Sequence, residues 1–139
     1  MAVEVKITYE GELHCTAVHT PSGSLLKTDA PVDNGGKGEF FSPTDLVATA
    51  LGTCIATTLG LYAQKKGLDI TGTEITVLKE MVSTPARRIG SLKVKVIIPK
   101  GQNFSDEQQA KFETIAKTCP VGRSLHPDVN VTIQFVYPK

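Results

Sequence analysis

The stretch SPTDLVATALGTC, residues 42–54, predicts the first turns of a long helix and ends on a cysteine. Ser42 is a good N-cap, Pro43 suits the first helical position, and Asp45 stands where a carboxylate can reach back to the cap. Ala, Leu and Thr then dominate as far as Lys65, where lysines followed by glycine predict the helix end. We therefore expect a helix of about 24 residues, about 36 Å long.

This predicted helix is unusual because no charged residue lies between Asp45 and Lys65. A helix on the surface of a protein normally carries a polar face. A chain of 139 residues has difficulty enclosing so long an uncharged helix alone. We therefore expect a partner subunit to cover part of it.

The segments on both sides of the helix show apolar residues at every second position, a pattern that predicts β-strands. The strands are expected over residues 3–9, 13–18 and 24–28 before the helix and over 74–82, 91–98 and 129–137 after it. A glycine-rich loop precedes the long helix, a helix capped by Ser105 is expected up to about Lys117, and a short helix begins at Pro120. Helices gathered in blocks between strands predict one α+β domain over residues 1–139, not a doubly wound fold.

The composition excludes several classes of protein. The formal net charge is +1 and the charges are scattered, so neither nucleic acid nor an acidic membrane is an expected partner. The N-terminal residues MAVEVKITYEGE lack the pattern of a secretory signal, and no apolar stretch is expected to approach the roughly 20 residues that span a bilayer. We expect a soluble, cytoplasmic protein in which the three cysteines begin as thiols.

The cysteines are the candidate chemical groups. Cys54 in mid-helix could simply pack in the core, because free cysteine behaves as a small buried hydrophobe. Cys119 precedes a proline at a predicted helix start, where unpaired backbone N–H groups and the helix dipole favour the thiolate. Cys15 lies in an alternating strand and is interpreted as structural.

The spacing of these residues argues against other kinds of site. Cys54 and Cys119 are too far apart in sequence for a C-x-x-C redox motif, and no paired zinc-ligand spacing exists. A metal site of Cys54, Cys119 and His126 is therefore disfavoured. No G-x-G-x-x-G motif occurs, so a bound nucleotide is not expected either. We expect no cofactor and no metal.

The segments SPTDLVATALGTC and CPVGRSL, at this separation, resemble those of the OsmC/Ohr family, the osmotically induced and organic hydroperoxide resistance proteins. The order of strands and helices agrees as well, so the resemblance covers nearly the whole chain. It implies an intertwined α+β homodimer in which antiparallel sheets from both chains wrap two long central helices. Such an arrangement would explain the uncharged helix.

The resemblance also implies a cysteine-based peroxidase acting on organic hydroperoxides and, in part, on hydrogen peroxide. By position, Cys54 is the peroxidatic cysteine and Cys119 the resolving one. Attack on the peroxide would leave a Cys54 sulfenic acid, which condenses with Cys119 to a disulfide. An external dithiol, of the lipoyl or thioredoxin-like kind, would then restore both thiols.

One feature departs from the pattern of the peroxidases in this family. Their reactive cysteine is supported by an Arg–Glu pair whose Glu directly follows the helix-starting proline, and here that position is Thr44. The candidate replacements are Asp45, Glu39, Lys37, Arg87 and Arg88, although each can equally be a solvated charge or, for Asp45, a helix cap. The alternatives left open are a non-enzymatic redox sensor, a protein that binds a small apolar ligand, and a dimer with two inert thiols.

Overall fold

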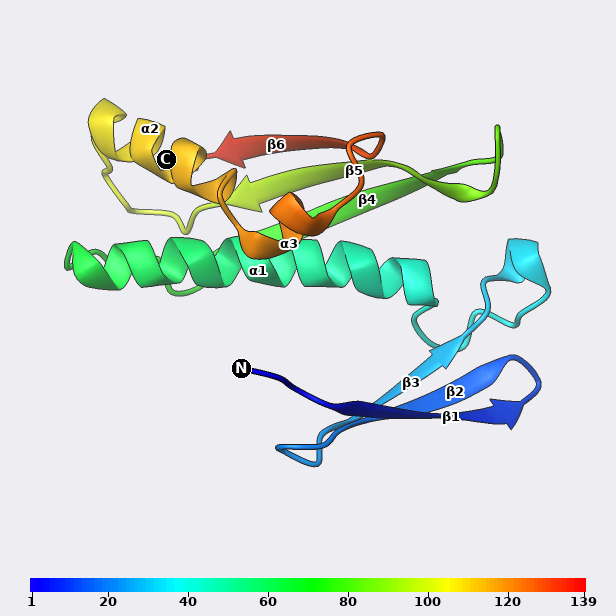
Figure 1. Cartoon of the computed structure of the whole chain (residues 1–139). Coiled ribbons are helices and arrows are strands. Elements are labelled where there is room, and N and C mark those ends of the chain that lie inside the picture. Colours follow the sequence, from blue (N-terminus) through cyan, green and yellow to red (C-terminus); the bar gives the residue numbers. More distant parts are fainter. The chain divides into compact units, whose positions relative to one another are not determined.

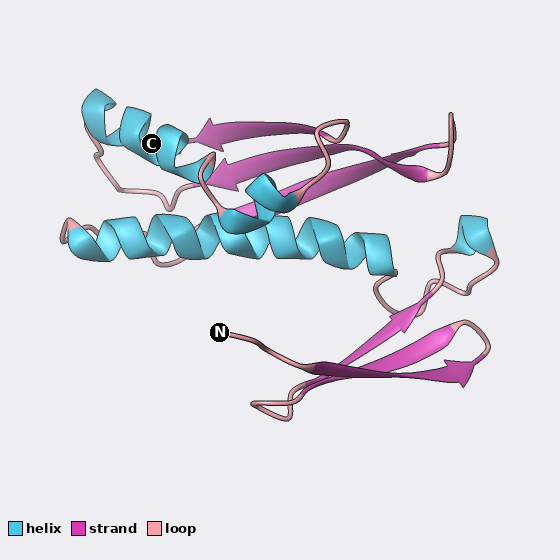
Figure 2. Cartoon of the chain, viewed as in Figure 1, coloured by secondary structure: helices cyan, strands magenta, loops and turns pink.

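The computed structural model describes all residues from Met1 to Lys139. They form two compact units, Met1–Val47 and Ala48–Lys139. The elements are β1 (Val5–Gly11), β2 (His14–His19), β3 (Leu25–Asp29), η1 (Val32–Asn34), α1 (Pro43–Lys65), β4 (Glu74–Val82), β5 (Arg88–Ile97), α2 (Asp106–Ala116), α3 (Pro120–Ser124) and β6 (Asn130–Val136) (Figures 1 and 2). Except for η1, this is the expected order, and the α+β class is confirmed.

The first unit contains an antiparallel sheet in the order β1-β2-β3. The chain then crosses a glycine-rich loop that contains η1, a single 3₁₀ turn that the sequence does not predict. At Gly36 a Cβ atom would lie only 1.7 Å from the carbonyl oxygen of Ala30. Glycine is therefore required here because the backbone of the loop folds directly onto the end of β3.

The second unit places α1 along one face of the sheet β4-β5-β6 (Figure 1). The inward side chains of β5 are buried, Leu92 and Val96 fully, as are Leu51 and Ile55 of α1. At Gly52 a Cβ atom would lie 3.1 Å from a methyl group of Val77, so glycine lets the helix approach β4 closely.

The pairing in the second sheet differs from the antiparallel sheets that the resemblance implies. Strands β4 and β5 are antiparallel, but β5 and β6 are parallel, with Val94 opposite Ile133. Parallel neighbours need a crossover connection, and α2 and α3 supply it between the two strands. The sheet is therefore mixed.

The helix caps follow the local sequence signals. The Ser42 N–H donates to Oδ2 of Asp45 at 2.9 Å, and the Asp45 N–H donates to Oγ of Ser42 at 3.1 Å. This reciprocal pair confirms the capping prediction for α1. In α2, Ser105 and Gln108 form the same kind of capping box.

The expectation about membrane-spanning length is wrong. Helix α1 has 23 residues and a mean hydropathy of 1.6 over its most apolar window, which is long and apolar enough to cross a membrane. This property rests on length and composition only, and a core helix of a soluble protein has it too. One third of that window, 33%, is buried within the chain.

An aromatic cluster joins α1 to α2 within the second unit. Phe112 is fully buried and meets the rings of Tyr62 and Phe104 edge to face, with centroids 5.7 and 5.0 Å away. We expect Phe112→Ala to lower the free energy of unfolding by about 3–5 kcal/mol, because it leaves a large cavity. Urea denaturation followed by circular dichroism measures this loss. Phe112→Leu should lose clearly less, and equal losses would contradict the packing argument.

Candidate functional site

The structure brings Cys54 and Cys119 together within the second unit. Cys54 lies on α1 and is half-buried, whereas Cys119 is 1% exposed and is the N-cap residue of α3. The Cys54 thiol lies close enough to the Cys119 thiol to raise its pKa. Cys54 and Cys119, which are far apart in the sequence, are therefore neighbours in the fold.

The surroundings of Cys119 hold its thiol in the protonated form. Burial raises the pKa of Cys119 above its ordinary value, and this effect outweighs the Gly122 N–H, which donates to Sγ at 3.3 Å and lowers the pKa. The neighbouring Cys54 thiol raises the pKa further, and the Val121 N–H lowers it. The expected geometry at the helix start is present, but the expectation that it favours the Cys119 thiolate is wrong because desolvation dominates.

Cys54 has a different setting. It lies in the middle of α1, where backbone N–H groups are committed to the helix, so no helix terminus contributes to its chemistry. The carbonyl of Cys54 accepts a hydrogen bond from the Thr57 hydroxyl at 3.1 Å. The Cys119 thiol is near Cys54, since Cys54 raises the pKa of Cys119.

A cavity of about 250 Å³ opens beside Cys119. Its lining includes Cys119, Gly122 and four apolar side chains, those of Leu51, Ala116, Val131 and Ile133, together with Lys117. Helices α1, α2 and α3 and strand β6 all contribute to it. The buried thiol therefore borders a mostly apolar space large enough for a small organic group.

The candidate arginines belong to the segment before and at the start of β5. Arg88 donates from Nη1 to the carbonyl oxygens of Ile89 and Asp128, at 3.2 and 3.5 Å, and so ties β5 to the loop before β6. Arg87 is exposed. Arg88 thus helps to hold β5 and the loop before β6 together. A supporting role beside Cys54 stays a prediction for Arg87 and Arg88.

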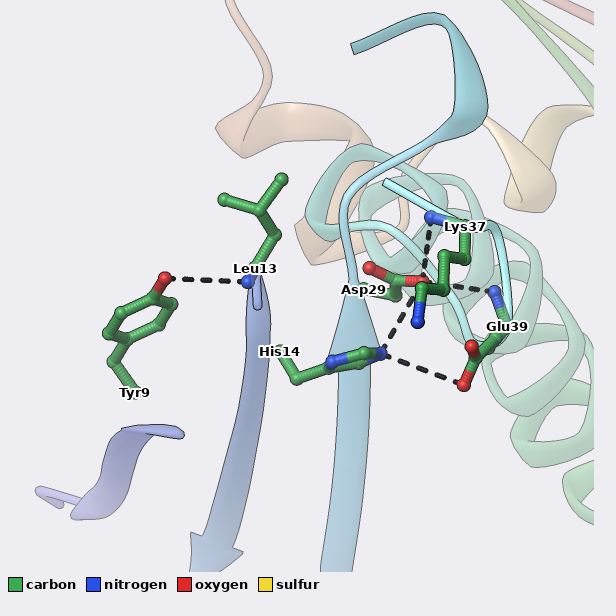
Figure 3. A network of polar contacts seen from close by, with 6 residues as sticks. All are labelled: Tyr9, Leu13, His14, Asp29, Lys37 and Glu39. Atoms are coloured by element: carbon green, nitrogen blue, oxygen red, sulfur yellow. Dashed lines mark hydrogen bonds and ion pairs between the residues drawn. The ribbon is translucent and has the colours of Figure 1, made fainter. Parts of the chain in front are cut away.

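The candidates Glu39 and Lys37 belong to a polar cluster in the first unit (Figure 3). Oδ2 of the buried Asp29 accepts hydrogen bonds from the backbone N–H groups of Lys37 and Glu39, at 3.2 and 3.1 Å. Nε2 of His14 lies 3.5 Å from Oδ2 of Asp29 and 3.7 Å from Oε2 of Glu39. This cluster fastens the glycine-rich loop to strands β2 and β3. The other acidic candidate, Asp45, caps α1.

The Asp29 carboxyl group is stabilised in its charged form. Burial acts to raise its pKa, but the hydrogen bond from the Glu39 N–H, the charge of His14 and the Lys37 N–H together bring the pKa below the ordinary value of 3.8. A depressed folded-state pKa contributes stability above the unfolded pKa, and that contribution is lost as the pH falls through the folded pKa.

We expect Asp29→Asn to destabilise the protein at neutral pH, because a neutral amide accepts the Glu39 and Lys37 N–H groups more weakly than a carboxylate does and offers no charge to His14. The difference in Tm between wild type and variant should be largest above about pH 5 and shrink below pH 4, where the wild-type carboxylate takes up its proton. Differential scanning fluorimetry from pH 3 to 8 measures this. Glu12→Gln, at an exposed acid of the same unit, is the control, and a difference independent of pH would contradict the assignment.

Cys15 is distant in sequence from Cys54 and Cys119, and it belongs to the first unit, whereas they belong to the second. It is half-buried on β2 beside a cavity of about 270 Å³ that His14, Lys27 and Phe40 also line. We assign it no role in the reaction, as the sequence pattern already indicates.

Sequence reasoning missed three contributors to these sites. Gly122 and Leu51 border Cys119, and His14 joins the Asp29 cluster. No local pattern marks them, because each acts through residues distant in the sequence.

Comparison with known proteins assigns the class of this fold. The family model described as OsmC-like protein matches residues 36–134. A crystal structure from Psychrobacter arcticus 273-4, of a protein described as osmotic stress induced and as a detoxification response protein, is 42% identical. It has a TM-score of 0.89 over 95% of this chain and 94% of that one. The chain therefore belongs to the OsmC-like family.

More distant structures share the fold alone. The organic hydroperoxide resistance protein OsmC of Legionella pneumophila is 15% identical, with a TM-score of 0.77 over 97% of this chain and 96% of that one. The organic hydroperoxide resistance protein OhrB of Bacillus subtilis is also 15% identical, with a TM-score of 0.71 over 98% of both chains. No curated protein matches this sequence.

Proposed function

We propose that this protein is a cysteine-based peroxidase that reduces organic hydroperoxides, with Cys54 as the peroxidatic and Cys119 as the resolving cysteine. The observation that carries the proposal is the interaction of the two thiols, one half-buried on α1 and one buried at the start of α3. Family membership supports it, as do distant relatives whose names refer to organic hydroperoxide resistance.

In the proposed reaction the Cys54 thiolate attacks the distal peroxide oxygen, the O–O bond breaks, and an alcohol leaves once its alkoxide has taken up a proton. Cys54 is then a sulfenic acid. The Cys119 sulfur attacks the Cys54 sulfur, the S–O bond breaks, and water carries away the hydroxyl group and the thiol proton. Because the thiolate is the nucleophile and the pKa of Cys119 is raised, its proton must leave as the sulfur attacks, and the departing hydroxyl group takes it up.

Recycling needs an external dithiol, of the lipoyl or thioredoxin-like kind, which is oxidised while the Cys54–Cys119 disulfide is reduced. The protein supplies thiols only, and the reaction requires no metal or organic cofactor. The described residues contain no group of three or more His, Cys, Asp or Glu side chains suited to a metal ion.

The cavity beside Cys119 favours an organic hydroperoxide as the substrate. Its aliphatic lining by Leu51, Val131 and Ile133 suits an alkyl or aryl group, with Lys117 as the one charged residue of the lining. Glu39, Asp45, Arg87 and Arg88 are proposed supporting residues, in place of the Arg–Glu pair that the family's peroxidases use.

We propose that the protein acts as a cytoplasmic homodimer in which a second copy covers α1. Thr49, Thr53, Thr57 and Leu61 form an exposed stripe of small or apolar residues on this helix. The hydroxyls of Thr53 and Thr57 donate to backbone carbonyls of their own helix, at 2.8 and 3.1 Å, and need no water. At Gly60 a Cβ would meet nothing within 4 Å, which leaves room for another helix.

The first unit also supports a partner subunit. Its three-stranded sheet exposes Val5, Ile7 and Tyr9 on alternate positions of β1, each at least half exposed. A small sheet with an apolar face needs another element packed on that face to be stable in water. A second copy of the chain would supply that cover.

The alternative function is redox sensing or small-ligand binding without turnover. The apolar cavity favours ligand binding. Redox sensing is favoured because Arg88 donates to backbone carbonyls, so that an arginine to support fast reaction of the Cys54 thiol is not evident. In the sensing case the same disulfide would form under oxidants, but a dithiol would not sustain rapid cycles.

The deciding experiment mixes the reduced protein with cumene hydroperoxide and a dithiol and follows the loss of peroxide. Multiple turnovers per subunit, with parallel oxidation of the dithiol, would support the peroxidase. Formation of one Cys54–Cys119 disulfide per subunit without further turnover would support sensing. A protein whose thiols stay reduced would refute both.

A further inference from the structure

The first turn of α3 is built around the Cys119 sulfur. Cys119 is the N-cap, and its Sγ accepts the Gly122 N–H at 3.3 Å. Sulfur is a weak acceptor, and helix N-caps are normally Ser, Thr, Asp or Asn. An oxygen would therefore cap the helix better than this sulfur does. We infer that cysteine is present at position 119 for the reactivity of its thiol.

Gly122 is the residue that makes room for that sulfur. A Cβ atom at position 122 would lie 3.2 Å from Sγ of Cys119 and 3.7 Å from Cδ1 of Leu51. The first distance is shorter than an ordinary carbon–sulfur contact, so either the sulfur or the helix turn would have to move. Gly122 has no left-handed backbone angle that would require glycine.

Helix propensity does not explain the glycine either. Glycine is a poor helix former, and alanine is the best residue for such a position. A residue selected only for a stable α3 would therefore not be glycine. The close approach of Sγ and of Leu51 is the remaining reason for its presence.

We propose that Gly122 is a positioning residue that holds the Cys119 sulfur toward Cys54 for disulfide formation. Its N–H binds Sγ on one side, and its missing side chain leaves space between Sγ and Leu51 of α1, the helix that carries Cys54. The inference rests on the proposed function, in which Cys119 attacks the Cys54 sulfenic acid. The S–S bond forms, the S–O bond breaks, and water leaves.

The consequence is that Gly122 acts on the condensation step of the cycle. The attack of Cys54 on the peroxide does not involve the Cys119 sulfur as a nucleophile, whereas the condensation requires it at bonding distance. A methyl group at position 122 should therefore delay the second step, independently of any effect that the same methyl group, in the lining of the cavity, has on the first. It should also destabilise the disulfide relative to the two thiols.

The test compares Gly122→Ala with wild type and with Arg123→Ala, an exposed neighbour on α3. Stopped flow with cumene hydroperoxide measures peroxide loss and disulfide formation as separate phases, so that slower entry of the substrate into the cavity is distinguished from slower condensation. Disulfide formation should be about tenfold slower in Gly122→Ala only, with more Cys54 sulfenic acid trapped by dimedone. In dithiothreitol redox buffers the disulfide of this variant should be about tenfold easier to reduce, or about 30 mV.

A second oxidant separates this inference from the proposed function. Diamide converts two thiols to a disulfide and becomes a hydrazine, so it needs no peroxidase activity. If wild type ignores hydroperoxide yet Gly122→Ala forms the disulfide slowly with diamide, the proposed function fails and the positioning role holds. Circular dichroism establishes that each variant is folded. Equal rates and equal redox equilibria in folded Gly122→Ala and wild type would overturn the inference, as would wild-type protein that forms no disulfide with diamide.

Discussion

Replacing Cys54 by serine is expected to abolish hydroperoxide reduction, with a loss of at least about 10³-fold in turnover, as for other catalytic nucleophiles. A serine hydroxyl is not ionised at neutral pH and cannot be oxidised to a sulfenic acid. Peroxide loss with cumene hydroperoxide and excess dithiol measures the effect. Because Cys54 is half-buried on α1, serine should fit its place, and an unchanged Tm will show that the loss is chemical.

Cys119→Ser should behave differently from Cys54→Ser. It should reduce one equivalent of peroxide at the wild-type rate and then accumulate Cys54 sulfenic acid, because no resolving thiol is present. Mass spectrometry after dimedone treatment identifies the trapped residue. Cys15→Ser, on β2 of the first unit, is the matched control and should retain full turnover. Turnover that survives in Cys54→Ser, or that depends on Cys15, would refute the proposed assignment.

The second large effect is expected at the exposed stripe of α1. Leu61 is 61% exposed in the single chain, on a helix without charge from Leu46 to Gln64. If a second copy covers it, Leu61→Glu places an unpaired carboxylate in an apolar interface. We expect the dissociation constant of the dimer to rise by at least about 100-fold.

Sedimentation equilibrium over a range of protein concentrations measures this change. Gln102→Glu adds the same charge on an exposed loop and should leave the dimer intact. Many dimers have no stable folded monomer. A Leu61→Glu variant that loses both the dimer and, by circular dichroism, its fold would therefore also support the proposed dimer. A wild-type protein that stays monomeric at micromolar concentration, or a folded Leu61→Glu with wild-type affinity, would contradict the proposed dimer.

Much of the fold could be predicted because its signals are local. Asp45 reaches back to Ser42, and the same reciprocal cap occurs in α2 between Ser105 and Gln108. The strand Glu74–Val82 has the predicted bounds because its residues alternate between half-buried and exposed along its whole length. By contrast, β5 begins earlier than expected, at Arg88, because its pairing partner β4 extends that far.

The candidate site could be predicted only in part. The two cysteine segments selected Cys54 and Cys119, and the structure places them near enough for Cys54 to raise the pKa of Cys119. The cavity, Gly122 and the cluster of His14, Asp29 and Glu39 have no local signature, because strands, loops and helices distant in sequence build them.

The sequence by itself determined the α+β class, the long uncharged helix with its cap, and the two cysteines worth testing, since these depend on neighbouring residues and on periodicity. Only the tertiary structure decided the ionisation of Cys119. The local helix start favours a thiolate, but the packing around the sulfur removes water and raises its pKa. Desolvation depends on everything folded around a group, which no short stretch of sequence contains.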